Sequence, residues 1–401
     1  MDIKDKINPL LTGDELNKAL TCLPKYNSEI RKVSASERFL ALNDFFNIYL
    51  PSQMTCEIYN KLYMALIRAI SKKGTLDAIK QSNLNRIQNN HGILGGADSF
   101  SIAGVSGIGK STAISKAISI ITNEDFFTCD NTKIIPFLMV QTPSDSSIKG
   151  LLMEVLRKVD SILNTNYHKD AIRSRATLDM LIGTVSQVSL NHIGVLILDE
   201  AQNLVEHKNG KNLVNALVQL INNSGISLCF VGTLECSQFF ESAFQLARRS
   251  IGLKYPSLPY GEFFENLCCV AFSFQYTNIS SSLSQSIVEW LYQHSGGVPA
   301  LVIGLIQAAQ EIAIVEGYEK LDIHTLNEAY QRRFGMLHSY INADNKQTSC
   351  TLTKSNQVSM VPIENLIIDD VFVKAIKEVK TNNIDALSYL KQFVSIEEIF
   401  V

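Results

Sequence analysis

Apolar residues recur along the first part of the chain with helical spacing. Between Pro9 and about Gly74 they follow the three- and four-residue pattern of amphipathic helices, most clearly over residues 58–70, and Pro51 interrupts the pattern. We therefore expect a small helical region here. Residues 73–96 are rich in Asn, Gln and Gly, which predicts a connector to the next domain.

From Asp98 onward, short β-rich apolar runs alternate with longer helical stretches. The predicted strands are residues 99–103, 134–140, 193–198, 226–231 and 268–274. Strands separated by helices of this length favour βαβ crossovers, so we predict an α/β fold whose parallel sheet has helices on both faces. After Tyr276 the strand pattern ends, and residues 283–317 and 322–341 predict the amphipathic helices of a second, helical module.

Composition adds bounds on size and charge. A chain of 401 residues with 46% apolar content can bury a sizeable core, and we expect two or three domains. Lys and Arg total 36 against 39 Asp and Glu, so no global charge attracts nucleic acid or anionic lipid. Any DNA binding must come from a local patch, or from a small patch repeated around an oligomer.

Cysteine usage and hydropathy favour a reduced, non-membrane environment. The eight cysteines show no C-x-x-C pair and no histidine at ligand spacing, so we expect buried reduced thiols. The first residues lack an apolar core of signal-peptide length, and no apolar run approaches the roughly 20 residues that span a bilayer. We expect a cytoplasmic location and no membrane partner.

A glycine-rich motif follows the first predicted strand and precedes a helical run at 113–121. It matches G-x-x-x-x-G-K-[ST] and consists of Gly104, Val105, Ser106, Gly107, Ile108, Gly109, Lys110, Ser111 and Thr112. Glycines let backbone N–H groups turn toward phosphate, and the helix N-terminus adds positive potential. Lys110 is expected to reach the β- and γ-phosphates of ATP, and Ser111 to bind Mg²⁺. The alternative is a chance glycine-rich turn between a strand and a helix.

Two acids end the apolar run at 193–198. Asp199 is expected to hold the metal, directly or through water, and Glu200 to polarise the water that attacks the γ-phosphate. An apolar strand that merely ends in solvated acids is the alternative. The phosphate-binding motif upstream favours the catalytic interpretation.

Three further candidates follow in the chain. Thr233, after the apolar run 226–231, could bind the attacking water or the γ-phosphate, or it could only cap the next helix. Arg248 and Arg249 follow a helical stretch, from which a guanidinium could reach the γ-phosphate bound to a neighbouring subunit. A solvated helix end with two arginines is the alternative.

The order of these motifs resembles the TnsC branch of the TnsC/TniB AAA+ regulators of DNA transposition. The resembling segments are 8–10, 36–38, the phosphate-binding motif, 143–150, 198–204, 231–233, 247–249 and 295–300. Many AAA+ proteins share the ATPase motifs. The specific part is the run Asp-Glu-Ala-Gln at 199–202, followed in order by Gly-Thr at 232–233 and Ala-Arg-Arg at 247–249.

The resemblance implies a fold, a domain organisation and partners. It implies a helical N-terminal region at 1–85 that could contact a target selector, an AAA+ core at 86–275, a helical lid at 276–345, and a linker and tail at 346–401 that could contact a transposase. The protein would form an ATP-dependent homo-oligomer, a ring or helical filament, around duplex DNA. It would link a target-selecting protein to transposase subunits and disassemble on ATP hydrolysis.

The resemblance also implies a place for DNA contacts. In the family the segment after the second strand lines the pore, which makes Lys149 the first candidate for a phosphate contact and Thr165 a weaker one. A solvated lysine is the alternative. Where many AAA+ proteins have a sensor arginine at the start of the lid helix, this chain has Gly-Val-Pro-Ala at 297–300. We therefore expect lid closure to be weak or to use another residue.

Two other classes of function are compatible with an ATPase core. An origin-recognition or STAND-type ATPase would assemble on protein partners, for instance in a defence complex, without DNA. A scaffold that never hydrolyses ATP is disfavoured because Lys110, Asp199 and Glu200 are all present. DNA-stimulated ATP hydrolysis would separate the transposition regulator from the protein-partner switch.

Overall fold

The computed structural model describes residues 6–73, 99–129, 132–145, 147–204, 226–236 and 250–335, together with positions 216, 219, 220 and 224. The chain divides into two compact units, Met1–Thr348 and Ser349–Val401. All described residues belong to the first unit. The predicted linker and tail lie outside them, and the predicted domain boundaries stay predictions.

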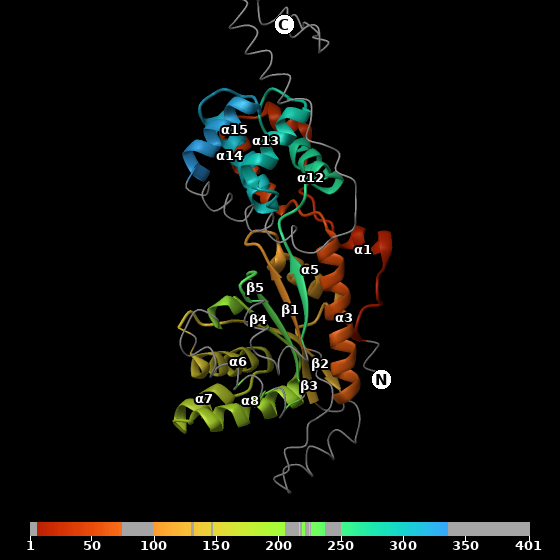
Figure 1. The fold of residues 1–401 in the computed structure, drawn as a ribbon, viewed down its shortest axis with the longest axis vertical. Coiled ribbons are helices and arrows are strands. Elements are labelled where there is room, and N and C mark those ends of the chain that lie inside the picture. The colour runs from red at the N-terminus through yellow and green to blue at the C-terminus, as the bar shows by residue number, and fades with distance from the viewer. Residues whose placement is uncertain are drawn as a thin grey trace, which may run out of the picture. The chain divides into compact units, whose positions relative to one another are not determined.

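A six-stranded sheet forms the centre of the first unit (Figure 1). Its strands are β1 (Ser99–Gly104), β2 (Phe127–Cys129), β3 (Thr132–Gln141), β4 (Ile193–Asp199), β5 (Ser227–Gly232) and β6 (Ser250–Tyr255), in the order β2-β3-β4-β5-β1-β6. All neighbouring strands are parallel except β2, which pairs antiparallel with β3. Every residue of β1, β4 and β5 is buried, as in parallel sheets covered on both faces. The predicted parallel sheet is confirmed.

Helices cover both faces of this sheet (Figure 1). One face packs against α6 (Ile148–Leu163) and α8 (Leu178–His192), with α7 (Tyr167–Arg173) beside α6. The other face packs against α3 (Gln53–Lys73) and α5 (Lys110–Ile121), and α1 (Gly13–Leu20) lies on α5. Alternate residues of β4 serve the two cores, because side chains of a strand point to opposite faces. Leu196 belongs to the core under α6 and α8, and Ile197 to the core under α3 and α5.

The helix predicted over residues 58–70 is α3. Its buried side chains repeat at helical spacing: Ile58, Tyr59, Leu62, Ala65, Leu66, Ala69 and Ile70. They pack on α5 and on β4. The N-terminal part of the chain therefore contributes a covering layer of the sheet.

A second group of helices follows β6. It contains α12 (Glu262–Ser273), α13 (Gln285–Ser295), α14 (Pro299–Val315), α15 (Ile323–Ala329) and the short π-helix Tyr330–Phe334. The 3-10 helices Ser28–Lys32 and Leu42–Asn47 and the helix α2 (Ala35–Ala41) contact this group, and Leu42 and Phe45 belong to its core. Arg38 is 3% exposed and donates to both carboxylate oxygens of Glu319, at 2.5 and 2.6 Å. This partly buried ion pair joins α2 to the helical module.

One predicted strand is wrong. Residues 268–274 belong mostly to α12, whose buried residues Phe264, Leu267, Cys268, Ala271 and Phe272 repeat at helical spacing. A short apolar run does not by itself distinguish a strand from a buried helix. The strand that completes the parallel sheet is instead β6, which the sequence did not predict. In β6, polar and small residues alternate with Ile251, Leu253 and Tyr255, as is typical of an edge strand.

The structure confirms the predicted burial for some of the cysteines and not for others. Cys229, Cys236 and Cys268 are buried free thiols, as predicted, whereas Cys269 is exposed. Within the described part of the chain, no single helix is long and apolar enough to cross a membrane, although the bent pair α13 and α14 meets the length and composition requirement when taken together.

Candidate nucleotide-binding site

The glycine-rich motif forms a loop between the C-terminal end of β1 and the first turn of α5. Gly107 has a φ of 81° and Gly109, the N-cap of α5, a φ of 100°. Glycine adopts this left-handed region without steric cost. The first N–H groups of α5 have no intrahelical partners, and together with the helix dipole they favour an anion. The local geometry is that of a phosphate-binding loop.

Lys110 lies at the base of this loop. Its ammonium group donates to the backbone oxygens of Gly104, at 2.7 Å, and Val105, at 3.0 Å. Burial lowers the pKa of Lys110, while the carboxylates of Asp199 and Glu200 act to raise it. To reach a phosphate, the ammonium would have to exchange these two carbonyl oxygens for phosphate oxygens.

Ser111 and Asp199 meet where α5 begins and β4 ends. The Ser111 hydroxyl donates to Oδ2 of Asp199 at 3.0 Å, and Oδ1 accepts from the backbone N–H of Glu200 at 2.9 Å. Asp199 is 8% exposed. A hydroxyl and a carboxylate are hard oxygen donors, which suit Mg²⁺. The described residues contain no cluster of three or more His, Cys, Asp or Glu that could hold a metal, so phosphate and water oxygens would have to complete the coordination.

Glu200 follows β4 in a constrained backbone conformation. Its φ is 58°, which is uncommon for a residue with a side chain. Such conformations cost free energy and persist where the surrounding structure enforces them, often at functional sites. Its carboxylate accepts a hydrogen bond from the Gln202 amide. The 3-10 helix Ala201–Leu204 follows directly and brings Gln202 back toward it.

Thr233 lies directly after β5, the strand between β4 and β1. Because carboxyl ends of parallel strands meet at one edge of the sheet, Thr233 lies at the same edge as the phosphate loop and Asp199. Its backbone N–H donates to Oε1 of Gln202 at 3.3 Å. Its role toward a γ-phosphate stays a prediction.

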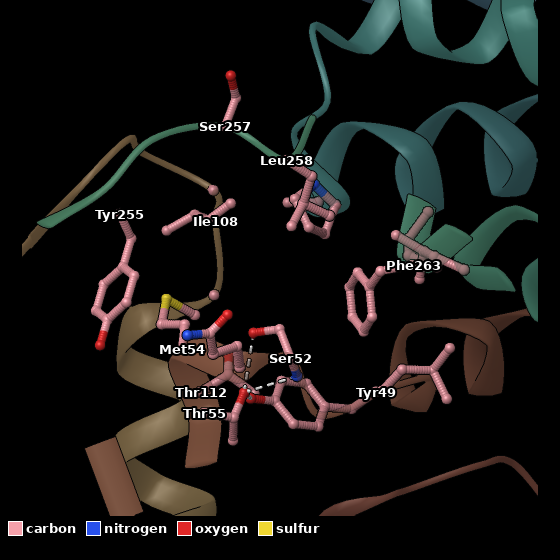
Figure 2. A pocket seen from close by; sticks show the side chains of 18 of the residues that line it. Tyr49, Ser52, Met54, Thr55, Ile108, Thr112, Tyr255, Ser257, Leu258 and Phe263 are labelled. Carbon is pink, nitrogen blue, oxygen red and sulfur yellow. Dashed lines mark hydrogen bonds between the residues drawn. The ribbon is translucent and has the colours of Figure 1, made fainter. Parts of the chain in front are cut away.

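A pocket of about 990 Å³ lies beside the phosphate loop (Figure 2). Several separate stretches line it: Cys22, residues 46–57, the loop with Thr112 and Lys116, residues 254–259, Phe263 and Leu267 of α12, and the start of α14. Figure 2 shows Tyr255 and Phe263 on opposite sides of the space, with Tyr49 between them near Ser52 and Thr55. Apolar and aromatic walls with a few polar groups are typical of small-molecule sites. The pocket has the surroundings that a nucleoside needs next to its phosphates. No pattern in the sequence predicted this pocket, because its walls are far apart in the chain.

The segment that contains the phosphate loop and Asp199 matches a known protein family. Residues 81–257 match the family described as "TniB: Bacterial TniB protein". The matched segment, which contains the phosphate loop and both acids, is therefore of the TniB/TnsC AAA+ type. None of the curated proteins compared with the chain matches it.

Solved structures resemble this AAA+ ATPase only distantly. The Aeropyrum pernix ORC1 protein in complex with DNA is 12% identical, with a TM-score of 0.41 over 76% of this chain and 74% of that chain. The Aeropyrum pernix ORC2 protein in its ADP form is 15% identical, with a TM-score of 0.40 over 77% and 74%.

The lid of this AAA+ ATPase touches the phosphate loop directly. The backbone N–H of Ala300, in the first turn of α14, donates to the Gly107 oxygen at 3.2 Å. A Cβ at position 107 would lie 2.9 Å from a methyl group of Val298, so only glycine allows this approach. In the stretch that lacks the sensor arginine, the lid therefore contacts the loop through backbone and small side chains.

The remaining predicted site residues are Arg248, Arg249, Lys149 and Thr165. Arg248 and Arg249 lie outside the described residues. Lys149 is exposed in the first turn of α6. The Thr165 hydroxyl donates at 2.6 Å to Oδ1 of Asp160, whose carboxylate also accepts the backbone N–H groups of residues 167 and 168. Thr165 thus has a structural role at the start of α7, and both DNA contacts stay predictions.

Proposed function

We propose that this protein is an ATP-dependent switch that assembles on duplex DNA, links a target-selecting protein to a transposase, and disassembles when ATP is hydrolysed. The observation that carries the proposal is the convergence of Lys110, Ser111, Asp199 and Glu200 at one sheet edge. It occurs within a segment that matches the TniB family. Together they support an ATPase whose nucleotide state controls assembly.

The residues of the site divide the work of hydrolysis among them. Lys110 would place its positive charge against the β- and γ-phosphates, in a partly buried site where charge interactions are strong. Ser111 and Asp199 would hold Mg²⁺, which neutralises phosphate charge when bound. Glu200 would accept a proton from, or orient, the attacking water.

Glu200→Gln separates binding from hydrolysis. The amide keeps the size of the side chain but cannot act as a base, while Asp199 and Ser111 are unchanged. We expect ATP binding and assembly on DNA to persist, turnover to fall by about 10²-fold or more, and disassembly to slow. Phosphate release and fluorescent-nucleotide binding measure the two effects. Glu154→Gln, the same change at a carboxylate paired with Arg157, is the control, and wild-type turnover in Glu200→Gln would remove Glu200 from the mechanism.

Lys149→Glu tests the assembly on DNA. One phosphate contact per subunit, repeated around an oligomer, adds to affinity at every DNA sequence. We expect weaker binding at all sequences and a shallower dependence on salt, measured by fluorescence anisotropy of labelled duplexes over a salt series.

Lys18→Glu is the matched control, because Lys18 is exposed on α1, which packs on the other face of the sheet. Unchanged binding by Lys149→Glu would place the DNA contacts elsewhere. ATP turnover that is indifferent to duplex DNA in an assembling wild-type chain would instead favour the switch that acts on protein partners.

A further inference from the structure

The side chain of Gln202 connects two strands of the nucleotide site. Its amide nitrogen donates to Oε2 of Glu200, which follows β4, and its amide oxygen accepts the backbone N–H of Thr233, which follows β5. One half-buried side chain thus holds the predicted base and the end of the neighbouring strand together.

The end of β5 is shaped to admit this amide. A Cβ at Gly232 would lie 2.7 Å from Oε1 of Gln202 and 2.5 Å from the sulfur of Cys236. Both distances are shorter than real Cβ contacts allow, so a side chain at this position would displace the amide. The φ of Gly232 is not in the left-handed region, which means that the lack of a side chain, and not the backbone conformation, is what the site uses.

The hydroxyl of Thr142 is a second polar group in the pocket that Glu200 lines. Together with Thr142, Glu200 lines this second pocket, of about 540 Å³. Thr142 is 4% exposed, and among the described residues its hydroxyl has no hydrogen-bond partner. Leaving a buried hydroxyl unpaired costs free energy. A Glu200 carboxylate released from Gln202 would therefore have an unpaired hydroxyl of the same pocket as an alternative partner.

We propose that Gln202 is a positioning residue for ATP hydrolysis, which sets the orientation of the Glu200 carboxylate relative to the end of β5. The inference rests on the proposed ATPase function. The role proposed for Gln202 is exerted through Glu200 and not on the phosphates or the attacking water. Its loss would leave nucleotide binding in place and would let Glu200 adopt unproductive orientations.

Gln202→Met is the principal test, because methionine keeps the length and volume of the side chain and loses both hydrogen bonds. We expect kcat to fall by about 10- to 100-fold, as for misplacement of a catalytic group, with the affinity for a fluorescent ATP analogue changed less than about twofold. Gln187→Met, the same change at an exposed residue of α8, should leave both values near those of the wild type.

Two further variants keep the inference testable if Gln202→Met does not fold. Gln202→Glu keeps the acceptor for the Thr233 N–H but turns a donor toward Glu200 into a second carboxylate, so its loss of kcat should be at least as large. Gly232→Ala leaves Gln202 in the sequence but displaces its amide, and it should reproduce the defect of Gln202→Met.

A double-mutant cycle distinguishes positioning from a general structural role. In a Glu200→Gln background, Gln202→Met should not lower the residual single-turnover rate further, since the group that it positions is already inactive. Unchanged kcat in Gln202→Met, an equal loss in the Glu200→Gln background, or a loss explained by weaker ATP binding would each overturn the inference and leave the ATPase function intact. A wild-type chain without ATP turnover would overturn both.

Discussion

Lys110→Ala is expected to abolish nucleotide binding, and assembly with it. The ammonium group of Lys110 is held by the backbone oxygens of Gly104 and Val105 at the base of the loop, within reach of phosphates bound there. Hydrogen bonds from a charged donor to phosphate are about twice as strong as neutral ones, and partial burial reduces screening by water. Alanine leaves the loop without its main positive charge. We expect ATP affinity to fall by about 10²-fold or more, measured by calorimetry or nucleotide fluorescence.

A matched lysine provides the control for this variant. Lys133 also donates to a backbone oxygen, that of Leu163 at 3.3 Å, but it lies near the start of β3, at the far end of the sheet from the phosphate loop. Lys133→Ala should therefore bind ATP like the wild type. Tight ATP binding by folded Lys110→Ala would refute the assignment of the phosphate loop.

Arg248→Ala or Arg249→Ala is expected to remove hydrolysis while the monomer still binds ATP. A site built from one subunit leaves charge on the transferring phosphoryl group uncompensated on its open side. A finger arginine supplies that charge and is worth on the order of 10³ in rate or more. We expect a loss of this size in phosphate release, together with weaker oligomers.

The strand register separates the start of β6 from the phosphate loop. Ser250, which follows Arg249 directly, pairs with Ser99 at the start of β1, whereas the phosphate loop leaves β1 beside Tyr255. The two positions are five residues apart along the strand, or about 17 Å at roughly 3.3 Å per residue. The start of β6 thus lies away from the phosphate loop of the same subunit.

Mixing inactive variants tests this arrangement. Lys110→Ala mixed with the inactive arginine variant should recover part of the turnover, because an interface can pair the intact loop of one subunit with the intact arginines of the other. Lys110→Ala mixed with Glu200→Gln should recover none, since both changes fall on the same subunit's half of the site. Folded proteins that co-assemble without any recovery in the first mixture would count against an arginine acting in trans.

Parts of the nucleotide site could be predicted from patterns of residues that are close together in the sequence. The residues of the phosphate loop are consecutive, and the conformations of Gly107 and Gly109 depend on their missing side chains. The apolar strand before Asp199 and the helical spacing in α3 likewise express constraints between residues that are near in the chain. The phosphate loop, the strand that ends at Asp199 and the helix α3 could therefore be predicted without a structure.

Pairing and contacts between distant segments could not be predicted in this way. Residues 268–274 have the composition of a strand, and only their packing with α13 and α14 makes them part of a helix. The weakly apolar β6 becomes a strand because β1 has a free edge to pair with.

By itself, the sequence determined the phosphate loop, the acidic end of β4 and the helical character of α3, because each depends on the backbone preferences and spacing of neighbouring residues. Only the tertiary structure decided that stretches far apart in the chain enclose the pocket beside the phosphate loop, that the lid contacts the loop through Ala300, and that Gln202 joins Glu200 to β5. The physical reason is that these contacts gain their free energy from burial and hydrogen bonding between segments far apart in the chain, which no short pattern encodes.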